Sequence, residues 1–130
     1  MTALVVVVAI VAGALGAVAR YGVTRAIAAR LGAAKLTRAV LIVNIVGSLI
    51  GGALIGATSG TAHEVQYILV GGFAGGLTTF STWTVETVQL VLEGRAGAAV
   101  RNVVANLVLG LLAASVGALV GAVVVGSIVA

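Results

Sequence analysis

The chain has 130 residues, of which 62% are hydrophobic and 8% charged, with 19 glycines and no proline. Soluble domains are about 45 to 50% apolar and about 25% charged, so this composition indicates a membrane protein. There is no cysteine for a disulfide, a thiolate metal site or a thiol nucleophile. One histidine and three carboxylates leave little material for acid–base catalysis, so we do not expect an enzyme.

The first uncharged run covers residues 3–19, near the lower end of the roughly 17 to 25 residues that cross a bilayer. Ala17-Val18-Ala19 imitates a signal-peptidase site. The basic residues follow this run instead of preceding it, so an uncleaved helix is favoured over a secretory signal. We interpret residues 20–38 as a helical connection at the membrane surface.

Three further spans are expected at residues 39–57, 65–92 and 103–128, which gives a single transmembrane domain over 1–130. The third contains four glycines in residues 71–76, each costing about 1 kcal/mol in a helix relative to alanine. A break is therefore predicted near 75–79, where unwound backbone must face protein, an ion or water. Uninterrupted valine runs do not alternate as barrel strands would, so the predicted class is an all-α membrane protein with four helices.

All seven lysine and arginine residues lie in the connections 20–38 and 93–102, and the opposite side has none. They neither line one helical face nor alternate with aromatics, so nucleic acid is not expected as a partner. By the positive-inside rule, both basic loops are expected to be cytoplasmic and both termini external.

Glycine pairs recur at four-residue spacing, just over one helical turn, and open flat stripes where another backbone can approach. They are Gly47/Gly51, Gly52/Gly56, Gly71/Gly75, Gly72/Gly76 and Gly117/Gly121. Most are interpreted as packing positions. Four helices of this length do not enclose a pathway alone, so an oligomer is expected, and a dimer is the simplest closed one.

Asn44 lies in the middle of the second span, where an unpaired amide would cost several kcal/mol. Two interpretations are equally supported: a hydrogen bond between helices, or an amide N–H directed at a passing anion. The hydroxyl cluster Thr78, Thr79, Ser81 and Thr82 follows the glycines and exceeds what bonding back to a helix requires. The unwound carbonyls there suit a small hard cation, and the hydroxyls suit an anion.

Phe80 and Trp83 are three residues apart and point to one side of a helix. Packing is the favoured interpretation, although a positive ring edge can also stabilise a small anion. Glu86 and Arg20 are charges within or at the end of spans. A structural ion pair or hydrogen-bonded anchor is favoured over a proton relay for them.

Three segments carry a resemblance to the Fluc or CrcB family of small fluoride channels. They are 13–21 (GALGAVARY), 43–51 (VNIVGSLIG) and 71–86 (GGFAGGLTTFSTWTVE), in the family's order and covering most of the chain. The resemblance implies an antiparallel, dual-topology-type dimer with two narrow pores in the cytoplasmic (inner) membrane. Fluoride would leak out passively through them, which reduces its toxicity in the cytoplasm.

The resemblance also implies site residues. The fluoride pore would contain Asn44, Phe80, Trp83, Ser81, Thr82, Arg20 and Asn106. The two rings would form ring-edge sites, and Arg20 would lie near the vestibule. A structural Na⁺ at the dimer interface would be held by main-chain carbonyls of Gly75 and Thr78 from both subunits. Amides, hydroxyls and ring edges are donors that can replace fluoride's water without trapping the ion.

The chain departs from the family at three points. Trp83 stands where the family usually has phenylalanine, which puts one pore in doubt. Asn102 and Asn106 stand where many members carry a tyrosine and a serine. An antiparallel homodimer needs nearly balanced loops, whereas the basic charge here is all on one side. We therefore expect pairing with a related subunit of opposite charge bias.

Two other functions are kept as alternatives. A small proton-coupled multidrug-type transporter needs an embedded carboxylate, and the first two spans have none. A purely structural membrane subunit would leave the broken span and its hydroxyls unexplained.

Overall fold

The computed structural model describes residues 2–31, 36–61 and 63–129, and these ranges are almost entirely helical, with no strand. Four stretches of this described part are long and apolar enough to cross a membrane: Ala3–Arg30, Thr37–Ala57, His63–Leu92 and Ala96–Ile128. The elements in chain order are α1 (Ala3–Leu31), α2 (Leu36–Ala57), α3 (His63–Gln66), the π-helix η2 (Tyr67–Ala74), α4 (Gly75–Leu77), α5 (Phe80–Leu92) and α6 (Ala96–Val129). The third span is thus divided among α3, η2, α4 and α5.

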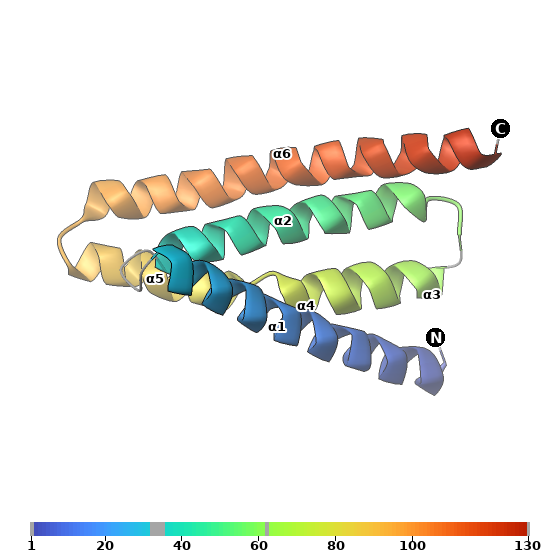
Figure 1. Ribbon diagram of the computed structural model, residues 1–130, viewed down its shortest axis with the longest axis horizontal. Helices are drawn as coiled ribbons and strands as arrows, with labels where there is room; N and C mark the ends of the chain where they lie inside the picture. Colours follow the sequence, from blue (N-terminus) through green and yellow to red (C-terminus); the bar gives the residue numbers. More distant parts are fainter. Residues whose placement is uncertain (1, 32–35, 62, 130) are drawn as a thin grey trace.

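The helices form an up-and-down bundle with both chain ends at the same end, as Figure 1 shows. We call the half nearer the chain ends the terminal half and the other the turn half. Gly94 makes the turn between α5 and α6 with φ 72°, a conformation that glycine adopts without strain. Part of the predicted basic connection, residues 20–31, continues α1, and residues 32–35, including Lys35, lie outside the described residues.

Helices α2 and α6 lie side by side along the bundle (Figure 1) and contact each other through small residues. A Cβ atom added at Gly52 or Gly56 would meet the backbone of Ala114 or Ala118 on α6. In the other direction, Gly121 faces the Ala53 carbonyl of α2. Such backbone contact gives van der Waals packing where lipid removes the hydrophobic driving force. The predicted packing role of these stripes is confirmed here.

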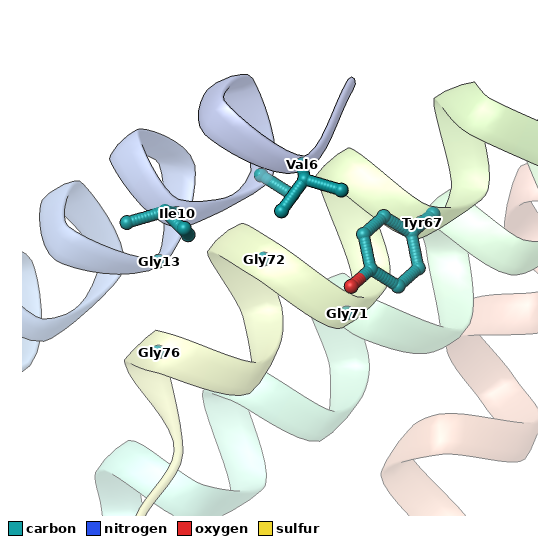
Figure 2. Close-up of a pocket in the computed structure, with 8 residues that line it drawn as sticks. Val6, Ile10, Gly13, Tyr67, Gly71, Gly72 and Gly76 are labelled. Atoms are coloured by element: carbon teal, nitrogen blue, oxygen red, sulfur yellow. The ribbon is translucent and has the colours of Figure 1, made fainter. Parts of the chain in front are cut away.

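Helix α1 packs on η2 and α4 in the same way. A Cβ at Gly72 would lie 2.7 Å from the Ala9 carbonyl oxygen, and one at Gly76 would meet the backbone of Gly13. Beside this contact, Figure 2 shows an apolar groove of about 380 Å³, with Val6 among its lining residues on α1 and Tyr67 on η2. Gly72 and Gly76 of the third span therefore serve as a packing surface for α1.

Few large side chains are buried among the described residues of this chain. The buried hydrophobic residues are Ala9, Ala39, Val40, Val43, Ala74, Leu77, Leu90 and Ala99. Leucine, isoleucine and valine side chains are instead exposed along every long helix, including Leu4 at 71% and Leu111 at 71%. An apolar exterior of this extent fits lipid or a second subunit as its surroundings.

Candidate functional site

The third span breaks at Thr78 and Thr79, within the predicted range. Thr78 has φ −82° and ψ 162°, and Thr79 has φ −143° and ψ 114°, so both are extended. Residues 71–76, which precede the break, remain helical in η2 and α4, and Gly72 and Gly76 among them pack against the backbone of α1.

Helix α5 restarts immediately after the break and is capped by Thr79. The Thr79 hydroxyl oxygen accepts from the backbone N–H of Thr82 at 3.2 Å, which is an N-cap bond. The same hydroxyl lies 3.0 Å from the Thr82 hydroxyl and 3.3 Å from that of Ser81. Three of the four predicted hydroxyls therefore lie together with Thr79 at their centre, whereas the Thr78 hydroxyl bonds back to the Ala74 carbonyl at 3.2 Å.

Side chains from α1 and α2 replace the backbone partners lost at the break. The Asn44 carbonyl oxygen Oδ1 accepts from the Thr79 N–H at 2.9 Å, and Asn44 Nδ2 donates to the Thr79 carbonyl at 3.2 Å. Arg20 Nη1 donates to the Thr78 carbonyl at 3.1 Å. Unwound backbone at bilayer depth is thus satisfied by protein groups, as the physics of the bilayer requires.

Asn44 also begins a chain of amides that crosses from α2 to α6 and then to α5. Its Nδ2 donates to Asn106 Oδ1 at 3.0 Å, and Asn106 Nδ2 donates to the Asn102 side-chain oxygen at 3.1 Å. Asn102 Nδ2 then donates to the Thr87 hydroxyl at 3.0 Å. Because Asn102 is buried, with 7% of its surface exposed, each bond compensates a desolvated amide.

Phe80 and Trp83 meet edge to face, with ring centroids 5.2 Å apart and an interplanar angle of 74°. The indole N–H of Trp83 donates to the Asn102 carbonyl at 3.3 Å, so this donor is used to join α5 to α6. Phe80 has 74% of its surface exposed in the single subunit. The interpretation that these two rings serve packing therefore fits Trp83. It fits Phe80 less well, because the Phe80 ring projects from the surface of the chain.

The structure brings Asn44, Asn106, Arg20, Ser81 and Thr82 together around the break. Their predicted contacts with fluoride stay predictions.

Three residues absent from the predicted site also belong to this hydrogen-bonded group: Thr79, Thr87 and Asn102. Thr79 had a local signal, because threonine is among the residues preferred at a helix N-cap. Asn102 stood out in the sequence only as a departure from the family's pattern. Thr87 had no signal, since its pairing with Asn102 depends on the relative rotation of two helices.

Gly75 and Thr78, the predicted cation ligands, both line a shallow groove of about 280 Å³ with Gly47 and Gly51 of α2. In a continuous helix the Gly75 carbonyl would accept from the Thr79 N–H, but that N–H donates to Asn44 instead. The Gly75 oxygen receives the Thr78 hydroxyl at 3.4 Å. The neutral Gly75 carbonyl oxygen is a ligand type that suits a small hard cation, whereas the Thr78 carbonyl already accepts from the Arg20 guanidinium.

Glu86 is buried, with 7% of its surface exposed. Within the described residues neither carboxylate oxygen has a hydrogen-bond partner. Arg20 therefore has the expected role of a hydrogen-bonded anchor, because it donates to the Thr78 carbonyl at the break. Glu86 forms no such bond within the described residues.

Comparison with known proteins agrees with the sequence motifs. The family model described as CrcB-like protein, Camphor Resistance (CrcB), matches residues 7–118. A protein of Nocardia farcinica named fluoride-specific ion channel FluC 1 is 47% identical over 93 residues, covering 71% of this chain and 63% of that protein, slightly less than two thirds of its length. Fluoride-specific ion channel FluC 2 of Natronomonas pharaonis is 44% identical over 92 residues, covering 71% of this chain and 72% of that protein.

A third relative, fluoride-specific ion channel FluC 1 of Symbiobacterium thermophilum, is 42% identical over 95 residues, covering 71% of this chain and 77% of that protein. The family match includes the second and third candidate membrane spans, most of the first and fourth, and the whole site around the break. This chain belongs to the CrcB family.

Proposed function

We propose that this chain is a subunit of a fluoride-specific channel that lets fluoride leave the cytoplasm passively across the inner membrane. The names of the relatives support this function. The observation that carries it is the break at Thr78 and Thr79, where amide, hydroxyl and guanidinium donors gather inside an otherwise apolar span. For a subunit with only a structural role, an unbroken helix would serve equally well.

The start of α5 offers donors suited to a small anion. The N–H groups of Phe80 and Ser81 lie in the first turn of α5, where no carbonyl of the same helix can accept from them. They are therefore available to an outside acceptor. The helix dipole adds positive potential at this end. The exposed Phe80 ring and the hydroxyls of Ser81 and Thr82 lie at the same place. These groups can replace fluoride's hydration shell without the deep trapping that a fixed charge would produce.

Asn44 serves this path in a specific way. Both hydrogens of its amide are engaged, one with the Thr79 carbonyl and one with Asn106. A fluoride ion contacting Asn44 therefore takes an N–H from one of these acceptors, and the acceptor takes it back when the ion leaves. Such an exchange keeps binding weak enough for conduction.

A sodium ion at the dimer interface would be held by the carbonyls of Gly75 and Thr78. It would neutralise the negative ends of backbone dipoles where two breaks meet. The Thr78 carbonyl already accepts a hydrogen bond from Arg20, so the Gly75 carbonyl oxygen is the more available ligand for the ion.

The working unit in this proposal is an antiparallel dimer. The exposed Phe80 ring and the small-residue groove at Gly47 and Gly51 support a partner surface close to the break. All seven basic residues lie on one side, so one topology with both basic connections in the cytoplasm is proposed, together with a related partner of opposite bias. Reporter fusions at the C-terminus test this: one external population supports it, and equal populations on both sides contradict it.

A fluoride electrode following efflux from proteoliposomes tests the function itself. Rapid release that needs no proton gradient is expected, and Phe80→Ile should slow it at least tenfold while Val104→Ile, on the exposed surface of α6, leaves it unchanged. Release that requires a proton gradient would instead assign the chain to the transporters, with the buried Glu86 as the carboxylate. If the chain alone releases no fluoride, the assay is repeated after coexpression with a family member whose basic loops lie on the other side of the membrane.

A further inference from the structure

A second polar site lies at the end of the turn half, away from the break. There α2, α5 and α6 enclose a cleft of about 410 Å³. Its polar lining residues are Thr37, Arg38, Arg95, Arg101 and Asn102. Among the described residues the lining contains no acidic side chain, and its three guanidinium groups come from α2, from the turn after α5, and from α6.

The charge of this cleft is poorly compensated by the protein. Arg95 pairs with Glu93 at 3.0 Å, in an exposed contact that contributes little. In the described ranges neither Arg38 nor Arg101 forms an ion pair. The three guanidinium groups give the cleft a positive potential that an anionic ligand would neutralise.

Two helix N-termini add to this potential. Helices α2 and α6 both begin at this end of the bundle (Figure 1), and the cleft is lined by first-turn residues of each, Thr37 and Ala98. The positive end of each helix dipole favours negative charge at such a position. Thr37 and the buried Asn102 add neutral polar groups to the lining of the same space.

We propose that this cleft binds a phosphate group, presented either by the headgroup of an anionic lipid or as free phosphate. The volume is far larger than a monatomic anion needs. Guanidinium groups bind phosphate oxygens in pairs of parallel hydrogen bonds, and basic pockets between membrane helices on the cytoplasmic side are suited to phospholipid headgroups. The site uses side chains other than those at the break, apart from Asn102, so it does not depend on the proposed fluoride path.

The test measures thermal unfolding of the purified protein in maltoside micelles. Dihexanoylphosphatidylglycerol, inorganic phosphate and sodium chloride of equal ionic strength are titrated separately. A saturable rise in the unfolding midpoint with phosphatidylglycerol, beyond the chloride response, is expected for the wild type. A matching rise with inorganic phosphate would assign free phosphate as a second source, and its absence would assign the lipid headgroup.

The paired variants decide whether the cleft is responsible. Arg38→Gln with Arg101→Gln should raise the apparent Kd at least tenfold, since two charge-assisted bonds are lost. The control, Arg25→Gln with Arg30→Gln, removes the same charge from α1 at the same end without touching the cleft. An equal response of both variants, or no saturable response of the wild type to either probe, overturns the proposal.

If the double variant does not fold, Arg101→Lys keeps the charge but loses the planar fork. It should retain several-fold less phosphatidylglycerol than the wild type in native mass spectrometry, and equal retention overturns the proposal. Fluoride efflux is not a readout here, so failure of this site leaves the channel function standing.

Discussion

The two halves of the bundle hold their helices together by different means. In the terminal half, glycines of α2, α6, η2 and α4 let backbones touch, as at Gly56 against Ala118 and Gly72 against Ala9. Towards the turn half, polar side chains make the contacts between helices: Arg20 to the break, Asn44 to Asn106, and Trp83 to α6. The first arrangement does not tolerate added volume, and the second does not tolerate a lost partner.

This difference explains where the third span breaks. The glycines that weaken the helix lie in the terminal half, where Gly72 and Gly76 are pressed against α1 and the segment stays helical. The chain unwinds one turn later, at the first position where side chains of neighbouring helices can take over the backbone bonds. A local weakness in the sequence thus becomes a break only where the tertiary structure can satisfy it.

The largest effect is expected from Gly56→Leu. The atoms that it would meet are backbone atoms of Ala118 and Ala122, which cannot move aside. We expect a loss of about 3 kcal/mol or more and no monodisperse protein, measured by thermal unfolding and size-exclusion chromatography. Gly126→Leu is the control, because nothing lies within 4 Å of an added Cβ there. Equal behaviour of the two variants would contradict the packing account.

The next largest effect is expected from Asn44→Ala. It leaves the N–H and carbonyl of Thr79 and the amide of Asn106 without their partner. We expect a loss of about 2 to 4 kcal/mol in detergent unfolding. Ser115→Ala, whose hydroxyl bonds only its own helix at Leu111, should change little. A cost below about 1 kcal/mol would show that the break is held by something else.

Arg20→Met should have a smaller effect, about 1 to 2 kcal/mol, because one charged donor to the Thr78 carbonyl is lost from a partly buried site. Arg25→Met is the matched change on the same helix, where the guanidinium bonds an exposed tyrosine. If both variants unfold at the same temperature, Arg20 does not support the break.

The smallest effect is expected from Trp83→Phe. It removes one bond to the Asn102 carbonyl, about 0.6 kcal/mol for an average interhelical bond in a membrane, and keeps an aromatic edge beside Phe80. Fluoride release should remain at the wild-type rate or rise. Loss of release would mean that the indole N–H itself belongs to the ion path.

Much of this architecture was predictable from the sequence. Long uncharged runs predicted the spans, and the positions of the arginines between these runs predicted which end of the bundle is basic. The hydroxyl cluster and Asn44 marked the polar centre. The π-helix, the amide chain through Asn102 and the indole bond were not predictable, because each depends on how one helix is rotated against another. Single-residue patterns do not encode that rotation.

Fluoride release from proteoliposomes containing the wild-type assembly or its Asn44→Ala variant tests the central claim most directly. The account predicts rapid release without a proton gradient for the wild type, and at least tenfold slower release for the variant at equal protein content. Release by a folded Asn44→Ala assembly at the wild-type rate would contradict it. So would a folded wild-type assembly that, with its partner present, releases no fluoride.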